Sequence, residues 1–393
     1  MSLPPDSPRS GRAKPRLVFL VTEFYFFHAM SADLAPPNVR EAFEVIIVAF
    51  CGNSAPAPTD AGYRVVDFPW RRSRALLQAA LQFPLELLRV RRLLTDLAPD
   101  VLHNIALKPA IIGALAVWDR DVKIVSSLTG FGFLFYARSW LAAVAQKACA
   151  VVLRHAARRN DAHIVLHNTV DVGFAKSLGI PAHNVRLVRG LGLDTARFAP
   201  LPQPPETPFR FLMIGRLLYM KGIEVIVAAM AELQRRGIAC ELTVCGGPDI
   251  DNPSTIPEEV IAEWGKRPGV RFVGQVSDVR QFIADSHVIV HPALGGEGLP
   301  RVLLEGSACT RPLIATDVSG NSDIVVNDVN GLLIPPGDVL ALADAMVWMM
   351  DNPEARLRMG AAGRERVLRE FASAHIAADY TAIYGELCPA AFQ

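Results

Sequence analysis

The sequence is poor in cysteine, in charge and in long apolar runs. Six cysteines in 393 residues, with no C-x-x-C pair and no His/Cys cluster, exclude a disulfide framework and argue against a structural zinc site. No apolar stretch reaches ~18 residues, so we expect no membrane-spanning helix. Apolar residues nevertheless make up 51% of the chain, which is enough to bury large cores. The length predicts about two domains.

Net charge is also nearly absent, at +1, which argues against a general nucleic-acid-binding protein. This total hides an asymmetry between the two halves of the chain. Residues 1–195 carry 23 Lys/Arg and 15 Asp/Glu, a net of +8, whereas residues 196–393 carry 17 and 24, a net of −7. Two halves of opposite charge indicate two domains with different partners, and the basic half suits an anionic surface.

The N-terminal sixteen residues, MSLPPDSPRSGRAKPR, contain no apolar core. They predict a disordered leader over 1–16 rather than a signal peptide. Together with the lack of a membrane span, this favours a cytoplasmic protein, which could still lie on a membrane surface.

Short apolar runs alternate with helical patterns along the whole chain, as in α/β proteins built on parallel sheets. The runs predict strands in the first half at 16–21, 45–50, 65–68, 101–105, 122–126, 163–166 and 185–188. Strands in the second half are predicted at 209–214, 241–245, 270–273, 288–291, 313–315 and 331–333. Helices are predicted between them, for example over 74–97 and 140–160. This pattern predicts two successive Rossmann-like domains.

The proline-rich segment APLPQPPETP at 199–208 interrupts the pattern at the midpoint and predicts an interdomain linker. We therefore expect an N-terminal domain over 17–198 and a C-terminal domain over 209–372. Residues 373–393 are expected to form a helix that packs back on the N-terminal domain. In such sheets, ligands bind where strands end and helices begin, so the loops after the strands are the candidate sites.

Two loops of the second half carry candidate binding groups. In GRLLYMKG at 215–222, glycine lets the backbone approach a ligand while Arg216 and Lys221 offer cations to a phosphate pair. The alternative is a surface loop with two solvated cations. In EGLPRVLLE at 297–305, we expect Glu297 and Glu305 to lie two helical turns apart and to grip sugar hydroxyls. Glu305 stands among apolar residues, so as a buried acid it would need a hydrogen-bonding partner.

Two other site types are disfavoured. Asp249-Ile250-Asp251 is a D-x-D that could hold a metal ion, but it stands in a Gly/Pro/Asn-rich segment where turn-forming acids are expected. No G-x-G-x-x-G follows the first predicted strand, which argues against a nicotinamide dehydrogenase. We therefore predict neither a metal nor a cofactor.

The two loops belong to an ordered set of motifs. Segments 273–278, 319–325, 330–333 and 336–338 complete a set that covers most of residues 209–370. The set resembles the large retaining glycosyltransferase family 4. The resemblance implies the GT-B fold, in which two Rossmann-like domains face each other across a cleft. It also implies a transferase that uses a nucleoside diphosphate sugar as its donor.

The resemblance assigns roles to individual residues. Arg216 and Lys221 would neutralise the donor diphosphate. Glu297 would hold hydroxyls of the transferred sugar, and Glu305 would hold the nucleotide ribose. The implied donor-binding set is Gly215, Arg216, Lys221, Val276, Glu297, Gly298, Leu299 and Glu305.

The first half matches the family less closely. Segment 100–109, followed by Gly113, resembles its His-containing strand end and helix, which makes His103 a candidate catalytic residue. The loop 22–28 lacks the usual glycines and ends at His28, a second candidate. Segment 127–133 stands where the family often has Thr-His-Gly. These two aromatic-rich departures resemble a subgroup that acts on polyprenyl-diphosphate-linked sugars in bacterial glycan assembly. Each histidine could equally be a hydrogen-bonded structural residue.

Aromatic and basic residues also gather in the first half, a composition that suits the interface of an anionic bilayer. The expected acceptor and membrane residues are Trp70, Arg71, Arg72, Phe131, Phe133 and Phe135. Ordinary amphipathic helices that cover a sheet would show a similar pattern.

The sequence thus predicts a metal-independent, retaining transferase on the inner face of the cytoplasmic membrane. It would move a hexose or N-acetylhexosamine from a nucleoside diphosphate sugar, with UDP favoured, to a polyprenyl-diphosphate-linked sugar in cell-surface polysaccharide or glycan assembly. Two alternatives remain: a catalytically silent nucleotide-sugar-binding subunit, and a transferase that acts on a soluble acceptor.

Overall fold

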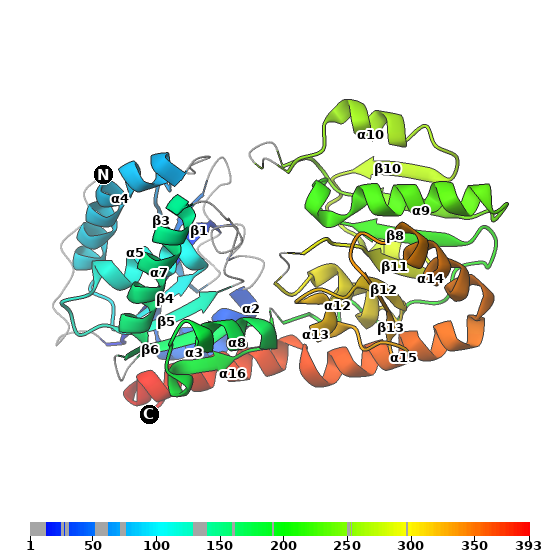
Figure 1. Cartoon of the computed structure of the whole chain (residues 1–393). Coiled ribbons are helices and arrows are strands. Elements are labelled where there is room, and N and C mark those ends of the chain that lie inside the picture. The colour runs from blue at the N-terminus through cyan, green and yellow to red at the C-terminus, as the bar shows by residue number, and fades with distance from the viewer. Residues whose placement is uncertain are drawn as a thin grey trace. The chain divides into compact units, whose positions relative to one another are not determined.

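The computed structural model describes residues 13–24, 27, 31–51, 62–70, 76–128, 140–158, 162–190, 192–249, 252, 254–295 and 298–393. The chain forms two compact units, each built on its own sheet (Figure 1). Unit 1 comprises Met1–Gly192 together with Ser373–Gln393, and unit 2 comprises Leu193–Ala372. Each unit is described by itself below.

Unit 1 contains a seven-stranded parallel sheet in the order β3-β2-β1-β4-β5-β6-β7. Its strands are β1 Arg16–Glu23, β2 Glu44–Phe50, β3 Arg64–Asp67, β4 Val101–Ile105, β5 Lys123–Leu128, β6 Ala162–Leu166 and β7 Val185–Leu187. Its helices are α2 Ser31–Leu34, α3 Pro37–Ala42, α4 Leu76–Leu97, α5 Leu107–Ala116, α7 Trp140–Arg158, α8 Thr169–Ser177, η3 Ala182–Asn184, α16 Ser373–Leu387 and η5 Pro389–Phe392.

Side chains of β1 alternate between two apolar layers. Leu17 and Phe19 pack on the face that α16 covers, whereas Val18 and Leu20 pack on the face that α4 covers. Because both faces are buried, these strands are continuous apolar runs instead of alternating ones. This explains why the sequence marks them clearly.

Unit 2 contains a six-stranded parallel sheet in the order β10-β9-β8-β11-β12-β13. Its strands are β8 Arg210–Ile214, β9 Glu241–Cys245, β10 Val270–Gly274, β11 Val288–His291, β12 Leu313–Thr316 and β13 Gly331–Ile334. Its helices are η4 Tyr219–Lys221, α9 Ile223–Arg235, α10 Glu258–Trp264, α11 Arg280–Ala284, α12 Arg301–Ala308, α13 Asn321–Ile324, α14 Val339–Asp351 and α15 Pro353–Glu370. All thirteen expected strands are therefore present, with ends within two residues of the predicted ones.

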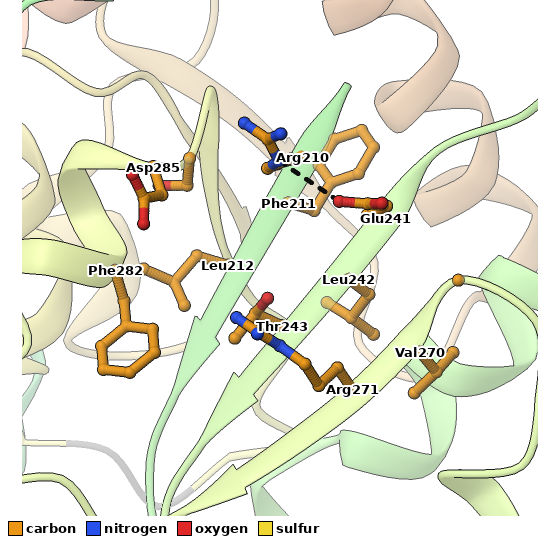
Figure 2. Close-up of a pocket in the computed structure, with 12 residues that line it drawn as sticks. Arg210, Phe211, Leu212, Glu241, Leu242, Thr243, Val270, Arg271, Phe282 and Asp285 are labelled. Atoms are coloured by element: carbon orange, nitrogen blue, oxygen red, sulfur yellow. Dashed lines mark hydrogen bonds and ion pairs between the residues drawn. The ribbon is translucent and has the colours of Figure 1, made fainter. Parts of the chain in front are cut away.

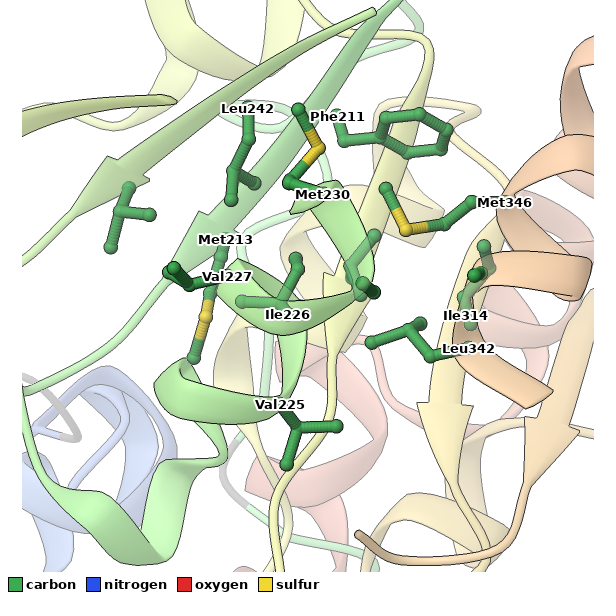
Figure 3. Packing of buried hydrophobic residues seen from close by; sticks show 14 of the residues in the cluster. Phe211, Met213, Val225, Ile226, Val227, Met230, Leu242, Ile314, Leu342 and Met346 are labelled. Carbon is green, nitrogen blue, oxygen red and sulfur yellow. The ribbon is translucent and has the colours of Figure 1, made fainter. Parts of the chain in front are cut away.

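Helices cover both faces of the second sheet. Phe211 and Met213 of β8 belong to a core shared with α9 and α14, which contribute Met230 and Met346 (Figure 3). Leu212 packs on the opposite face with residues of α12 and α15. In both units, the strand order reverses between two neighbouring strands, because the chain continues from one of them toward one edge of the sheet and from the other toward the opposite edge. These strands are β1 and β4 in unit 1, and β8 and β11 in unit 2.

The proline-rich segment 199–208 lies within unit 2 rather than between the units. The guanidinium of Arg311 is buried and donates to five backbone carbonyls, including those of Leu201 at 3.2 Å and Pro202 at 2.6 Å. Arg356 is also buried and forms two hydrogen bonds with Glu206, of 2.8 and 2.9 Å. Because these two arginines form hydrogen bonds with the segment at several points, the segment is a fixed part of unit 2 and not a free linker.

The C-terminal helix α16 packs beside α2 in unit 1. Its buried side chains Ile376, Tyr380 and Tyr384 belong to the same core as β1 and β2. All six cysteines are free thiols. Among the described residues, no helix combines the length and the apolar character that crossing a membrane requires.

Candidate functional site

The candidate site of unit 2 lies between β8 and β11, where the strand order reverses. In parallel α/β sheets, ligands bind at this point, outside the carboxyl ends of the strands. The loop after β8, which contains the GRLLYMKG motif, contacts the loop after β11 there. The backbone N–H of Leu294 donates to the carbonyl of Met220 at 2.9 Å. The two loops that the sequence singles out are therefore adjacent.

Gly222 makes this close approach possible. Its φ of +72° lies in the left-handed region, and a Cβ on it would lie 1.9 Å from the carbonyl oxygen of Pro292. Any other residue would force the two loops apart. The glycine closes the short η4 turn, and α9 begins at the next residue, Ile223.

Gly215 opens the same loop. A Cβ on Gly246, at the end of β9, would lie 1.8 Å from the carbonyl oxygen of Gly215, so the two backbones touch. The N–H of Gly215 donates to the carbonyl of Cys245 at 2.9 Å. On its own outer side, by contrast, a Cβ on Gly215 would meet no described atom within 4 Å. A ligand could therefore approach the backbone at Gly215 directly.

Arg216 follows this glycine and is paired with an acid. Its guanidinium forms an ion pair with Asp249 at 2.5 Å, and its side chain is 60% exposed. Asp249 is the first carboxylate of the D-x-D sequence, while Asp251 lies outside the described residues. The described carboxylate thus serves as the counter-ion of an arginine. Lys221, the second cation of the motif, is half-buried in the η4 turn.

Glu305 lies on α12 and is 9% exposed. Its carboxylate accepts a hydrogen bond from the Arg301 Nε at 3.0 Å, which is the partner that a buried acid requires. Burial raises the pKa of Glu305, and the positive charges of Arg301 and Arg197 partly offset this effect, whereas Asp278 adds to it. This carboxylate is poorly solvated, and a ligand hydroxyl could donate a hydrogen bond to it.

Two expectations about the EGLPRVLLE segment need revision. The helix α12 begins at Arg301 with Pro300 as its N-cap, so the nine-residue segment is not one continuous helix. Glu297 lies outside the described residues, and of its neighbours Leu299 packs against the core that α12 and β12 share. The predicted two-turn spacing of the two carboxylates along a helix is therefore wrong.

Val276 lies in the loop after β10, half-buried against the same core as Leu299. In this loop Arg280 donates hydrogen bonds to Asp278, which lower the pKa of that carboxyl to about 2. The charge of Asp278 also affects Glu305, so the loop approaches α12. The structure thus brings the loops after β8, β10 and β11 to one end of the sheet.

His103 of unit 1 is fully buried and hydrogen-bonded at both ring nitrogens. Its Nδ1 contacts the Tyr384 hydroxyl and its Nε2 contacts the Ser127 hydroxyl, each at 2.7 Å. Tyr384 donates to the carbonyl of Leu34 at 3.1 Å, so it accepts from a protonated Nδ1. Ser127 then donates to Nε2 and accepts from Tyr380 at 3.2 Å.

This chain of hydrogen bonds leaves His103 neutral. Burial lowers its pKa to about 3, and nearby His167 acts in the same direction. With no exposed atom and both nitrogens in use, His103 holds β4, β5 and α16 together. The expectation that it acts on a substrate is therefore replaced by a structural role. His28, the other candidate, lies outside the described residues.

Trp70, which was predicted to contact the acceptor or the membrane, is half-buried, and that role stays a prediction. Its ring meets that of Phe68 edge-on at 5.0 Å, and the Lys108 ammonium lies 5.4 Å from the ring centre. The side chain packs against the core beneath α4. The other residues of that prediction, Arg71, Arg72, Phe131, Phe133 and Phe135, lie outside the described residues.

A pocket of about 510 Å³ in unit 2 lies elsewhere (Figure 2). Its lining comes from the beginnings of β8, β9 and β10 and from the end of α11, and an Arg210–Glu241 ion pair of 3.2 Å crosses two of these strands. None of the predicted donor-binding residues is among those that line it. The candidate site at the opposite strand ends is therefore distinct from this pocket.

Comparisons with known families agree with the architecture of each unit. The family model "Glycosyl transferases group 1" matches residues 197–366, within unit 2. The model "Glycosyl transferase 4-like domain" matches residues 29–190, within unit 1. Together they cover most of the chain. The chain belongs to the group 1 glycosyltransferases, and its two Rossmann-like units are those of the GT-B fold.

Individual relatives narrow this class. The chain is 28% identical to a glycogen synthase of Mycobacterium tuberculosis over 72% of this chain and 68% of that one. It is 29% identical to the putative colanic acid biosynthesis glycosyltransferase WcaL of Escherichia coli, over 44% of each chain. The match spans about half the length of several curated relatives. The protein is thus related to enzymes of polysaccharide biosynthesis.

A solved structure shows the same fold at lower identity. Anabaena Alr3699/HepE, solved in complex with UDP, superposes with a TM-score of 0.73 at 17% identity. The superposition covers 95% of this chain and 100% of that one. At this identity the likeness concerns the fold alone.

Three interactions of the site were not part of the sequence interpretation. Arg301 partners Glu305, Asp249 partners Arg216, and Arg197 adds positive charge near Glu305. Of these, only Arg301 has a local signal, because its i,i+4 spacing from Glu305 on a predicted helix indicates an ion pair. The other two interactions join segments that are distant in the sequence.

Proposed function

We propose that the protein is a retaining glycosyltransferase that moves a hexose or N-acetylhexosamine from a nucleoside diphosphate sugar to a lipid-linked sugar. The observation that supports the proposal is that the loop after β8, with Gly215, Arg216 and Lys221, meets the loop after β11, which leads into α12 and Glu305. UDP is the favoured nucleotide, since Anabaena Alr3699/HepE was solved with UDP. The polyprenyl-diphosphate-linked acceptor is proposed from the motifs of the first half and the relation to WcaL.

The donor diphosphate would lie over Gly215, beside two cations. Arg216 is now paired with Asp249, and the diphosphate would exchange with that carboxylate as the arginine's partner. As the sugar leaves, negative charge develops on the diphosphate, and Arg216 and Lys221 would stabilise it. Glu305 would accept hydrogen bonds from the ribose hydroxyls, and Glu297 those of the transferred sugar.

Chemically, the acceptor hydroxyl would attack the anomeric carbon from the face that the diphosphate leaves. The bond to the acceptor oxygen forms as the bond to the phosphate oxygen breaks, and the departing phosphate takes the acceptor proton. The anomeric configuration is then retained without a covalent enzyme intermediate. Since the two cations neutralise the leaving group, we propose that no metal ion takes part.

A second candidate function is transfer to a soluble acceptor. The match to the glycogen synthase of M. tuberculosis, over 72% of this chain, favours it. The donor chemistry would be the same in both cases. The two candidate functions therefore differ only in the acceptor. The protein would lie on the inner face of the cytoplasmic membrane only if the acceptor is lipid-linked.

The first experiment is a thermal-shift screen of UDP- and GDP-sugars, because a bound donor raises the melting temperature by mass action. Transfer of a radiolabelled sugar from the best donor to a polyprenyl-diphosphate-linked acceptor, with and without chelator, then tests the reaction. Lys221→Ala and Glu305→Ala should abolish transfer, whereas Lys266→Ala and Glu354→Ala, exposed in the same unit, should not. Unchanged transfer in the first pair would refute the site, and loss of transfer in chelator would refute metal independence.

A further inference from the structure

Two helices of unit 1 carry large apolar side chains on their outward faces. On α4, Leu81 is 75% exposed, and Leu85 and Leu88 are about half exposed. The three residues, with Arg92, follow each other at helical spacings of four, three and four, so they form one stripe, and Arg89 lies beside it. The opposite side of α4 packs on the sheet. An amphipathic helix that only covered a sheet would have a polar outer side.

The helix α7 repeats this arrangement. Trp140 is 79% exposed, and Val144 and Val151 are more than half exposed. Lys147 and Arg158 lie in the same stripe and are exposed. Large apolar side chains are thus mixed with cations along both stripes.

The two stripes belong to one surface. The helix α5 contacts both α4 and α7 and is almost entirely buried, so the three helices lie side by side on one face of the sheet (Figure 1). With neighbouring helix axes about 8–10 Å apart, the stripes are about 20 Å from each other. Between them, the half-exposed ring of Trp118 stacks on His155 of α7 at 3.8 Å.

The charge of this surface is positive. The 19 residues of α7 contain no Asp or Glu. On α4, Glu86 is buried and paired with Lys108, and Asp96 is exposed in the last turn. Asp119, after α5, is paired with Arg91. The exposed cations of the stripes therefore outnumber the exposed acid.

We propose that the outward stripes of α4 and α7 are the surface by which the protein lies on an anionic lipid bilayer. The proposal rests on the proposed function, because a lipid-linked acceptor requires the protein at a membrane. Apolar side chains would enter the boundary between headgroups and acyl chains, while Arg and Lys contact the lipid phosphates. A symmetric second copy is a poorer occupant, because it would place the cations of one stripe against those of another.

The test is co-sedimentation with vesicles of phosphatidylcholine alone or with 30% phosphatidylglycerol, without donor or acceptor. Wild-type protein should bind the anionic vesicles, and Leu85→Gln/Leu88→Gln should weaken binding about 10-fold or more. Arg92→Gln/Lys147→Gln should weaken it about 5-fold per charge and only on anionic vesicles. Leu357→Gln/Arg358→Gln, a matched exposed pair on α15 of unit 2, should bind as wild type.

A spectroscopic readout locates the contact. Trp140 is one of five tryptophans, and vesicles should shift the protein emission to shorter wavelength in wild type and clearly less in Trp140→Phe, where Trp118 is left on the same surface. Melting temperatures of all variants should match wild type, because the changed side chains are exposed.

Three results would overturn the proposal. The first is equal binding by the stripe variants and wild type, and the second is no vesicle binding by wild type. The third is a wild-type dimer that Leu85→Gln/Leu88→Gln dissociates. Any of these could occur while transfer to a detergent-solubilised lipid acceptor proceeds, which would leave the proposed function intact. Vesicle binding without any transfer would instead refute the proposed function alone.

Discussion

Replacing Glu305 by glutamine should weaken donor binding and change how stability depends on pH. The substitution keeps the size of the side chain and one acceptor oxygen but removes the charge. The carboxylate is 9% exposed and its Oε1 accepts from the Arg301 Nε at 3.0 Å. The effects on donor binding and on folding have different causes and can be measured separately.

The loss of donor affinity follows from the strength of hydrogen bonds to a charged group. Such a bond contributes about 1.5–3 kcal/mol, so its loss should raise the Kd for the donor nucleotide about 10- to 150-fold. Isothermal titration with UDP measures this change. Glu354→Gln, an exposed change in the first turn of α15, is the control and should leave the Kd unchanged.

The effect of pH on stability has the opposite sign to that of a carboxyl whose pKa is lowered by an ion pair in the folded protein. Burial raises the pKa of Glu305 in the folded protein, so the folded state binds its proton more tightly than the unfolded state. The free energy of unfolding of wild type therefore falls as pH rises from 4.5, the ordinary pKa of a glutamate, through the raised pKa of Glu305. Glutamine does not titrate, so the variant should gain stability relative to wild type over that interval.

Urea unfolding of both proteins at intervals from pH 5 to pH 8 measures the difference. A difference that does not change with pH would show that burial does not perturb this carboxyl. A variant Kd equal to that of wild type would remove Glu305 from the donor site. Either result would refute the corresponding part of the reasoning.

Three further substitutions test the structure. Tyr384→Phe removes the hydroxyl between His103 Nδ1 and a carbonyl of α2, and should lower the free energy of unfolding by about 1–3 kcal/mol in a urea titration. Gly222→Ala places a Cβ against the loop after β11 in a left-handed conformation; it should cost at least about 1 kcal/mol in stability and raise the Kd for the donor. Arg311→Leu removes a buried hydrogen-bond donor from five carbonyls and should cost about 3–5 kcal/mol, measured by thermal unfolding.

Each of these changes has a matched control. Tyr380→Phe removes a single, longer bond of 3.2 Å and should cost less than Tyr384→Phe. Gly173→Ala introduces a Cβ that meets nothing within 4 Å, and should be neutral or stabilising. Arg358→Leu changes an exposed arginine of α15 and should leave unfolding unaltered. Reversal of the Tyr384 and Tyr380 effects would refute the proposed direction of the hydrogen-bond chain.

Much of the fold is legible in the sequence because of burial. The run Val45–Phe50 of β2, for example, is apolar throughout, since both faces of a parallel sheet are covered. The prediction of a linker at 199–208 is wrong, because proline content reflects only the local backbone. It carries no information on the distant side chains that fix the segment. Arg311 and Arg356, more than a hundred residues away, decide that this segment is fixed.

The candidate site, like the fold, can be predicted from the sequence only in part. The motifs place Arg216, Lys221 and Glu305 on loops and a helix that follow strands, because a strand, a loop and a helix start are continuous in sequence. The sequence gives no distance between those loops. The glycine contact at Gly222 and the Arg216–Asp249 pair join segments more than thirty residues apart, and both arise only when β8, β9 and β11 lie next to each other.

By itself, the sequence determined the strands, the two α/β halves and the charged loops of this glycosyltransferase, because each depends on neighbours along the chain. Tertiary structure alone decided that His103 is enclosed by Tyr384 of the C-terminal helix and that Trp70 is packed under Lys108. It also decided that α4 and α7 turn apolar stripes outward. Whether a side chain is buried, paired or exposed depends on what covers it, and the covering residues come from distant parts of the chain.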